Sequence, residues 1–419
     1  MSWCAGRTSG WETEHPMKIR GDFWRIGLVA AWGLVVGWTP ASAQKQYDSG
    51  ASDKEIRIGN LSSYTGPDAA YGSTGKAEAA YFKMINDRGG INGRKIVFVS
   101  LDSQSADPMA LAHKLIDEDK VLLIFGSQAG GANLAIRPYM NEQKIPQLFV
   151  GGSGFSGWND PEHYPWTMGF LPSWKSEGAA YARYVLENKP EAKIGVLYRN
   201  DEMGRDYLEG MREALGDKAS TMIVKEVSYD KEGAALGDQV DQLKASGASV
   251  FMNFSFGHFA TDTIRRAYDL DWHPVQFIPT GSLSISAFLE PAGLEKAAGI
   301  ISSAHSKGWL RGQAATDPDV AEFLDWMKTY NTDGNIRDAL NVWAYEVSQV
   351  LVHILAKCGD NLTRANVMTQ ATSLDMDVKM LRPGIRVTTS LTDYRPVKQL
   401  FLIRFDGRGW VSAGKIISE

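Results

Sequence analysis

Residues 56–96 read IRIGNLSSYTGPDAAYGSTGKAEAAYFKMINDRGGINGRKI. A short β-branched run opens this stretch, a loop follows, and a longer amphipathic run then ends at Gly89-Gly90. Glycines end helices because they accept the positive φ angle that other residues resist. A second β-branched run begins at Lys95, so the stretch predicts a strand, a helix and a second strand.

The same alternation continues along the chain. Asp107-Pro108 is typical of a helix start, because the acidic side chain caps backbone N–H groups and proline suits the first turn. This succession predicts a parallel, doubly wound α/β sheet. The expected strands are 55–61, 95–101, 121–125 and 147–150, and the expected helices are 73–88, 107–119 and 131–143.

After a stretch rich in Gly, Pro and aromatic residues at 151–172, the alternation resumes. Two βα blocks of similar size and a returning segment predict two Rossmann-like lobes joined by more than one crossing. A hairpin with a glycine-rich turn at 406–409 is expected near the end. The further expected strands are 193–198, 221–227, 248–254, 275–278 and 298–304, and the further helices are 174–188, 204–215, 235–245, 258–270, 318–330, 337–356 and 363–370.

Residues 1–43 have the features of a signal peptide. Basic residues precede the apolar run IGLVAAWGLVVGW (26–38), and Ala41-Ser42-Ala43 forms a small-residue cleavage site. A membrane-spanning helix needs about 20 apolar residues, so this shorter run favours a cleaved signal over a retained anchor. We expect cleavage after Ala43 and export to the periplasm. The polar residues 44–54 are expected to form a loose leader.

Composition excludes several classes of protein. The 419 residues include 44 basic and 49 acidic side chains, for a net charge of −5, which argues against a bulk nucleic-acid binder. The two cysteines are too few for a disulfide scaffold or a cysteine-rich zinc site. Cys4 lies in the predicted signal peptide, so Cys358 is expected as a buried small apolar residue on a helix.

No motif supports catalysis. Gly152–Gly157 matches G-x-G-x-x-G, but the prolines that follow, such as Pro161 and Pro165, exclude the helix that a dinucleotide site requires. Asn253–Gly257 resembles a nucleophile elbow without its first glycine. The histidines after residue 43 are scattered without metal-ligand spacing, so we expect no enzyme activity, no metal and no cofactor.

Two glycine-rich loops follow adjacent predicted strands. The first, Gly126–Asn133, leads into the helix predicted at 131–143, and the second is Gly151-Gly152-Ser153. Glycines allow close approach of the backbone, and the N–H groups at a helix start attract anions. Together the loops predict a site for a small anionic group such as a carboxylate, although glycines that only form tight turns are the alternative.

The residues quoted above resemble the branched-chain amino acid-binding proteins of ABC importers. The resemblance rests on the loop Thr65-Gly66-Pro67 with Tyr71 after it, on Gly89–Gly93, and on Asp102 after the second strand, and it continues more loosely to Ala344-Tyr345-Glu346. It implies a type I periplasmic-binding fold with three hinge crossings. Residues 55–171 and 305–380 would form the first lobe, and 172–304 and 381–419 the second.

The resemblance also implies a ligand site in the cleft. Its carboxylate pocket would contain Gly130, Gly131, Gly151 and Ser153, with Tyr71 over the ligand. From the second lobe, Met203, Phe256 and Gly281 would face the ligand, and Phe155 and Phe254 are further apolar candidates, of which Phe254 is more simply explained as core.

One departure from the family pattern bears on the ligand. Amino-acid binders carry a glutamate near Thr280–Ser282 that pairs with the ligand ammonium, and this chain has none between Asp271 and Glu290. A buried ammonium without a counter-charge is costly, unless Asp201 or Glu202 turns toward it. An aromatic or other organic acid is therefore expected rather than a simple aliphatic amino acid.

The sequence thus predicts a monomeric, periplasmic solute-binding protein that delivers a small carboxylate-bearing molecule to an inner-membrane ABC permease. The alternatives are an amide or urea-type ligand, the ligand-sensing domain of a signalling or chemoreceptor system, and an enzyme on the same scaffold, against which the missing nucleophile–base pair speaks.

Overall fold

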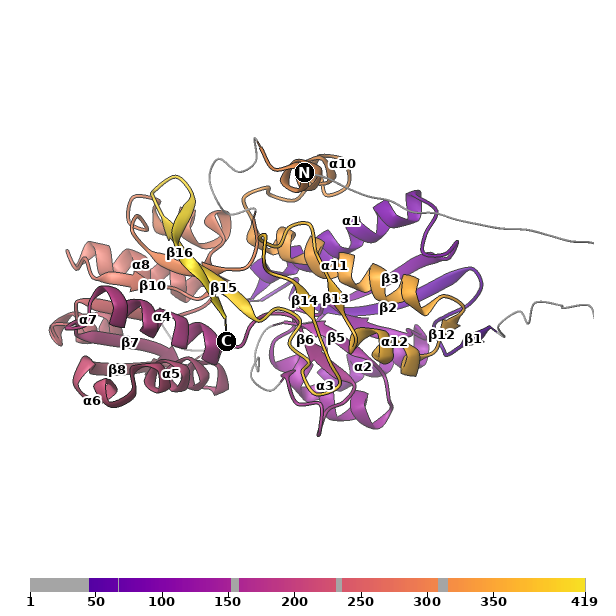
Figure 1. Ribbon diagram of the computed structural model, residues 1–419, viewed down its shortest axis with the longest axis horizontal. Helices are drawn as coiled ribbons and strands as arrows, with labels where there is room; N and C mark the ends of the chain where they lie inside the picture. Colours follow the sequence, from indigo (N-terminus) through magenta and orange to yellow (C-terminus); the bar gives the residue numbers. More distant parts are fainter. Residues whose placement is uncertain (1–44, 67, 152–157, 231–235, 308–315, 419) are drawn as a thin grey trace, which may run out of the picture. The chain divides into compact units, whose positions relative to one another are not determined.

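The computed structural model describes residues 45–418 except 67, 152–157, 231–235 and 308–315. Residues 44–419 form one compact unit, shown in Figure 1. The predicted signal peptide lies outside the described residues. Among the helices that are described, none combines the length and the apolar character that crossing a membrane requires.

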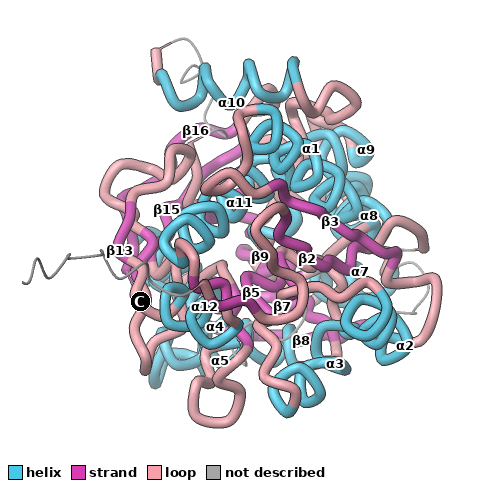
Figure 2. The backbone as a smooth tube through the Cα atoms, turned by 90° about the vertical axis from the view of Figure 1, so that its right-hand side faces the viewer, coloured by secondary structure: helices cyan, strands magenta, loops and turns pink. Residues whose placement is uncertain are grey.

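The first part of the chain builds a parallel sheet, here called the first sheet, with the strand order β3-β2-β4-β5-β6. Two apolar clusters cover its two faces: α1 packs with α11 on one, and α2 packs with α3 on the other (Figure 2). The strands are β2 (Glu55–Ser62), β3 (Lys95–Asp102), β4 (Leu123–Phe125), β5 (Gln147–Val150) and β6 (Thr167–Gly169); the helices are α1 (Ser73–Asp87), α2 (Pro108–His113), α3 (Gly131–Glu142) and α11 (Ala339–Cys358). The doubly wound α/β class predicted from the sequence is confirmed.

The predicted helix boundaries at two sites have clear physical causes. The Asp107 carboxylate accepts hydrogen bonds from the N–H groups of Met109 at 2.9 Å and Ala110 at 3.3 Å, which caps α2. Gly90, just after α1, has a φ of 80°, and a Cβ there would lie 2.0 Å from the Arg94 carbonyl oxygen. Only glycine fits this turn.

Two predicted boundaries in the first sheet are wrong. The helix expected over 107–119 is interrupted, because α2 ends at His113 and a π-helical segment, Lys114–Glu118, follows. β4 begins at Leu123 rather than at Val121, since the Val121 N–H bonds back to the carbonyl of Leu115 and so still belongs to the preceding turn.

Several short strands formed by tertiary pairing were not predicted, and β6 and β1 are examples. β6 lies within the stretch at 151–172 that showed no strand pattern. β1 (Gln46–Tyr47) pairs in parallel with β12 (Asn361–Leu362), so part of the expected loose leader is in a sheet. Tyr47 donates to the Asp53 carboxylate at 2.7 Å and accepts from Arg94 at 2.6 Å, which anchors the leader further.

The second sheet has the order β16-β15-β11-β10-β9-β7-β8. Five strands are parallel, and the predicted C-terminal hairpin β15–β16 adds two antiparallel strands at β11. The strands are β7 (Ile194–Arg199), β8 (Ile223–Tyr229), β9 (Val250–Phe254), β10 (Val275–Phe277), β11 (Ile301–Ala304), β15 (Gln399–Phe405) and β16 (Trp410–Ser418). A mixed sheet results, in which the hairpin supplies one edge.

Helices and a short strand pair complete the unit. In the second part of the chain, α4 and α5 pack against each other beside the second sheet (Figure 1). The elements are α4 (Trp174–Asn188), α5 (Glu202–Leu215), α6 (Ala219–Met222), α7 (Gly237–Ala245), α8 (His258–Asp269), α9 (Glu290–Ala292), α10 (Pro318–Thr329), α12 (Arg364–Ala371), β13 (Asp375–Met376) and β14 (Val387–Thr388).

The last third of the chain returns to the first sheet before it ends in the second. α11 packs along α1 (Figure 1), with the rings of Tyr81 and Tyr345 at 5.2 Å. Cys358 at the end of α11 is buried, and burial raises the pKa of its thiol to about 12, so it serves as the small apolar residue expected. The lobe boundaries at 171, 305 and 380 stay predictions.

Candidate ligand-binding site

A cavity of about 1140 Å³, including the solvent at its mouth, lies where loops of the two sheets meet. The β2–α1 and β4–α3 loops contribute Tyr71 and Gly130 from the first sheet. The second sheet contributes residues at the carboxyl ends of its parallel strands, such as Arg199, the last residue of β7, and Phe256, which follows β9. This is the edge at which ligands of open parallel sheets bind.

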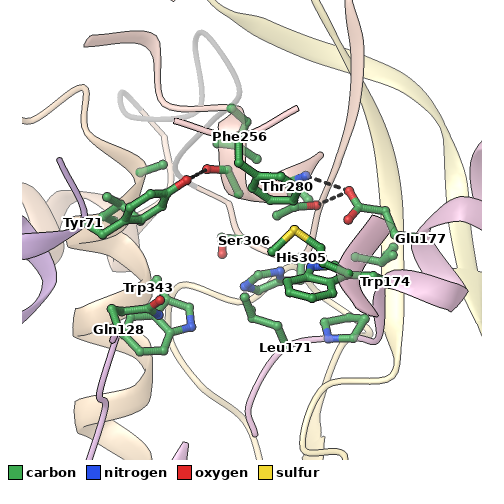
Figure 3. A pocket seen from close by; sticks show the side chains of 18 of the residues that line it. Tyr71, Gln128, Leu171, Trp174, Glu177, Phe256, Thr280, His305, Ser306 and Trp343 are labelled. Atoms are coloured by element: carbon green, nitrogen blue, oxygen red, sulfur yellow. Dashed lines mark hydrogen bonds between the residues drawn. The ribbon is translucent and has the colours of Figure 1, made fainter. Parts of the chain in front are cut away.

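Tyr71 connects the two sides of the cavity. It lies in the 3₁₀ turn Ala69–Gly72, and its hydroxyl donates to the Gly281 carbonyl at 3.3 Å (Figure 3). Its ring centroid is 6.1 Å from that of Phe288. Burial raises the pKa of the Tyr71 hydroxyl, which therefore stays protonated as a hydrogen-bond donor.

Aromatic rings form one wall of the cavity. Trp174, at the start of α4, stacks on the buried Tyr207 with centroids 6.1 Å apart. Phe256 lies 6.0 Å from Trp174, and Met203 of α5 is buried beside this group. Such a wall offers a flat apolar surface to a ligand.

Glu177 is a buried carboxylate in the cavity lining. It is 4% exposed, and its Oε1 accepts from the Thr280 N–H at 2.7 Å and the Thr280 hydroxyl at 2.6 Å (Figure 3). The hydroxyls of Ser303 at 2.7 Å, Tyr181 at 2.5 Å and Tyr207 also donate to it. These five donors stabilise the charge within the protein itself.

Arg199 brings a cation to the lining. It ends β7, is buried, and donates from Nε to the Asp201 carboxylate at 2.5 Å. Asp201 also caps α5 through the Gly204 N–H at 3.2 Å. The guanidinium carbon lies 5.8 Å from the centre of the Phe256 ring, and Asp68 lines the same cavity. A guanidinium has the planar donor geometry that suits a carboxylate.

The structure bears on the argument that the chain lacks a glutamate near Thr280 to pair with a ligand ammonium. The segment between Asp271 and Glu290 has no acidic residue, but Asp68 and Glu177 place two carboxylates in the cavity lining. Asp201 is engaged with Arg199. The sequence reasoning did not consider these two carboxylates, because both come from segments distant from Thr280 along the chain.

A second buried pair lies beside the cavity. His305, directly after β11, lines the cavity, and its Nε2 is 3.4 Å from Oε2 of Glu346 on α11. Trp343, one turn earlier on α11, also lines the cavity. Figure 3 shows His305 and Trp343 with Gln128 among the lining side chains.

The sequence-predicted site residues divide into three groups. Tyr71, Gly130, Met203, Phe256 and Gly281 line the cavity, and their contact with a ligand stays a prediction.

Gly131 and Gly151 are not among the lining residues. The Gly151 N–H donates to the Ser127 carbonyl at 2.9 Å, and the Gln128 side chain covers Gly151, where a Cβ would lie 2.1 Å from the Gln128 amide nitrogen. Ser153 and Phe155 lie outside the described residues. Phe254 is core, as expected, with its ring 4.3 Å from that of Tyr207.

The sequence reasoning missed several lining residues. Arg199 follows a predicted strand, so its place at the carboxyl end of that strand could have identified it. Trp174, Glu177, His305 and Trp343 carried no local signal, because their segments meet only in the folded chain. Within the described ranges, no group of three His, Cys, Asp or Glu side chains is arranged to hold a metal ion.

Comparison with known proteins adds a family match. The profile of a periplasmic binding protein family matches residues 55–413. An amino acid binding protein of Pseudomonas aeruginosa is 26% identical over 213 residues, which are 47% of this chain and 52% of that protein. The chain thus spans about half the length of this curated relative.

Solved structures share the fold at low sequence identity. A branched-chain amino acid ABC transporter protein from Thermus thermophilus, with bound valine, has a TM-score of 0.74 at 15% identity, covering 87% of this chain and 97% of that one. A solute-binding protein from R. palustris, in complex with 4-hydroxybenzoate, has a TM-score of 0.73 at 16% identity, covering 87% and 98%. The type I periplasmic-binding fold expected from the sequence is confirmed.

Proposed function

We propose that this chain, which belongs to the periplasmic binding protein family, captures a small carboxylate-bearing solute and delivers it to an ABC importer. We further propose that it acts in the periplasm as a monomer after removal of residues 1–43, and that it is a receptor without catalytic activity. The observation that carries the ligand class is the buried Arg199 beside the aromatic wall of the cavity.

Arg199 and the aromatic wall favour complementary parts of one ligand. A guanidinium can bind a carboxylate through two parallel hydrogen bonds, and the low dielectric of a buried site strengthens them. Trp174, Phe256 and Met203 would then pack on a flat or apolar body. An aromatic or other apolar carboxylic acid fits both features.

An α-amino acid is the second candidate, and Asp68 is the observation in its favour. This carboxylate lines the cavity from the β2–α1 loop and could pair with a ligand ammonium. Glu177 is less suited to this role, because its oxygens already accept five hydrogen bonds from the protein. Amide and urea-type ligands, which need no charge partner, come third.

Binding would act through closure of the two sides over the ligand. The ligand would contact residues of both sheets, so it would stabilise the closed form that the permease recognises. The Tyr71–Gly281 hydrogen bond would contribute to the same closed form.

A thermal-shift screen on residues 44–419 tests the ligand class. A specific ligand raises the melting temperature when its concentration exceeds Kd. We expect the largest shifts from aromatic acids; leucine, isoleucine or valine at the top would favour the amino-acid candidate, and urea or amides at the top would contradict the carboxylate.

Arg199→Gln tests the proposed carboxylate partner. We expect the variant to weaken the best carboxylate ligand at least tenfold by isothermal titration calorimetry, since hydrogen bonds to charged groups contribute about 1.5–3 kcal/mol. Arg205→Gln, on the exposed side of α5, is the matched control and should bind normally. Unchanged affinity in Arg199→Gln would remove Arg199 from the ligand site.

The transport role is tested in cells that lack the protein. Deletion should abolish uptake of the labelled ligand, and expression of the intact chain should restore it. Normal uptake with a lost transcriptional or chemotactic response to the ligand would instead support the sensing role.

A further inference from the structure

One part of the cavity lining has polar atoms without partners. His305 is 5% exposed, and neither ring nitrogen has a hydrogen-bond partner among the described residues. Trp343 is also 5% exposed, and its indole N–H likewise has no partner within the described part of the chain. A buried polar group without a hydrogen bond is energetically unfavourable. Both side chains line the cavity, so a ligand can supply the missing partners.

Glu346 orients the His305 ring. It is completely buried on α11, and neither carboxylate oxygen accepts a hydrogen bond from the residues that the structure describes. Its Oε2 lies 3.4 Å from Nε2 of His305. A buried carboxylate at this distance favours a proton on Nε2, which leaves the Nδ1 lone pair for another donor.

The backbone around His305 is held by contacts with the segment 380–382. The His305 carbonyl accepts from the Arg382 N–H at 3.0 Å, and Ser306 forms a bridge with Leu381. The histidine ring is therefore presented from a supported segment, which suits a group that selects between ligands.

We propose that His305, oriented by Glu346, is a specificity-determining residue that hydrogen-bonds a hydroxyl group of the ligand. The preferred ligand is then a hydroxylated carboxylic acid, and this inference rests on the proposed function. A hydroxyl donates to His305 Nδ1 and can accept from the Trp343 N–H, whereas a hydrogen atom or a methyl group leaves both unsatisfied. A second carboxylate fits less well, because it would add negative charge near Glu346.

Pairs of ligands that differ in one hydroxyl group test the proposal. Benzoate is compared with 3- and 4-hydroxybenzoate, and valine with its near-isostere threonine, by calorimetry on residues 44–419. In at least one pair we expect the hydroxylated member to bind at least tenfold more tightly. In His305→Phe the two members should bind within about twofold of each other.

Two further variants keep the test valid if His305→Phe fails to fold. The double variant H305F/E346L removes the buried carboxylate together with its partner and should also lose the preference. Met203→Leu, elsewhere in the cavity lining, is the control: it should change the affinity for both members by a similar factor and keep their ratio.

The positioning role of Glu346 has its own readout. Glu346→Gln keeps a side-chain oxygen beside Nε2 and should keep most of the hydroxyl preference, whereas Glu346→Leu should lose it. The affinity for the unhydroxylated member should change less than twofold in either variant. An unchanged preference in Glu346→Leu would overturn this role.

The outcomes separate the two proposals. Carboxylates that bind without a hydroxyl preference, or a preference that survives His305→Phe, would overturn the assignment of His305 and leave the proposed function intact. If none of the carboxylates binds, the proposed function fails, and this inference fails with it.

Discussion

At the scale of single residues, the carboxylate of Glu177 joins α4 to the second sheet. It accepts hydrogen bonds from Thr280 and Ser303, which follow β10 and lie in β11, and from two buried tyrosines. Burial and the charge of Glu177 raise the pKa of the Tyr181 and Tyr207 hydroxyls, so both remain donors. The Glu177 carboxylate is thus held by hydrogen bonds from the protein and forms part of the cavity lining.

Glu177→Gln should therefore destabilise the protein. An amide presents N–H groups where the carboxylate accepts hydrogen bonds, and we expect a loss of about 2 kcal/mol in the free energy of unfolding by urea denaturation. Glu187→Gln, at an exposed position of the same helix, should leave stability within about 0.5 kcal/mol. Equal stability of both variants would show that the network contributes little.

Glu78 makes stability depend on pH. It is fully buried on α1, accepts from the Asn60 amide at 3.0 Å, and burial raises the pKa of its carboxyl well above the ordinary 4.5. Below pH 4.5 the Glu78 carboxyl is protonated in both the folded and the unfolded state. Its burial therefore does not reduce the free energy of unfolding there. As pH rises from about 4.5 toward the raised folded pKa, only the unfolded state loses the proton, so stability falls by up to about 1.4 kcal/mol per pH unit.

Glu78→Gln should remove this contribution to the pH dependence. Urea unfolding between pH 5 and pH 8 should show a smaller fall in unfolding free energy in the variant than in the unaltered protein. Glu142→Gln, at an exposed position of α3, is the control and should keep the original slope. If the unfolding free energy of Glu78→Gln still falls as steeply with pH, other titrating groups cause the pH dependence.

At the scale of elements, the α2 region shows which signals act locally. Asp107 and Pro108 set the start of α2 as predicted, because the cap and the proline act within one turn. The predicted end of the helix, at residue 119, is wrong, because α2 ends at His113. There Lys114–Glu118 form a π-helical segment, and the apolar residues Leu115 and Ile116 are buried in the cluster between α2 and α3. Packing, rather than a local breaker, accompanies the change.

Asp107→Ala should destabilise the protein by about 1 kcal/mol, because it removes the acceptor for the N–H groups of Met109 and Ala110. Asp107→Asn keeps an oxygen at the cap, so its free energy of unfolding should fall by only a few tenths of the loss expected for Asp107→Ala. Chemical denaturation of the three proteins measures the difference. Equal losses in both variants would point to the charge rather than to the cap.

At the scale of the whole compact unit, Tyr71 is a contact between the two sides of the cavity. Its hydroxyl donates to Gly281 across 210 positions of sequence. Ser284 makes a second contact of this kind, donating to Asp338 at the start of α11 at 3.1 Å. In the closure that we propose, contacts of this type would favour the closed arrangement, and a ligand would add to them.

Tyr71→Phe should shift the ligand-free protein toward an open form. Loss of the Tyr71–Gly281 hydrogen bond, worth about 1 kcal/mol, would change the ratio of open to closed forms about fivefold. Small-angle X-ray scattering would detect the change as a larger radius of gyration. Tyr64→Phe is the control, because the Tyr64 hydroxyl bonds to Ser100 within the first-sheet region, at 2.6 Å. A similar change in both variants would argue against a specific role of Tyr71 in closure.

The sequence by itself determined the alternation of strands and helices, the α2 cap, the turn at Gly89-Gly90 and the C-terminal hairpin. These features depend on periodicity and on interactions within a few residues. Five of the predicted site residues lie at the cavity because loops after parallel strands meet at one edge.

Only the tertiary structure decided the pairing of β1 with β12 and the chemistry of the cavity. Glu177 meets Thr280 from 103 positions away, and Glu346 on α11 lies beside His305, which follows β11. The segment around Thr280 has no glutamate, as the sequence shows, but Asp68 and Glu177 reach the cavity from segments far away along the chain. The strands and turns are local consequences of the sequence, whereas the charges and donors that line the cavity follow from how distant segments pack.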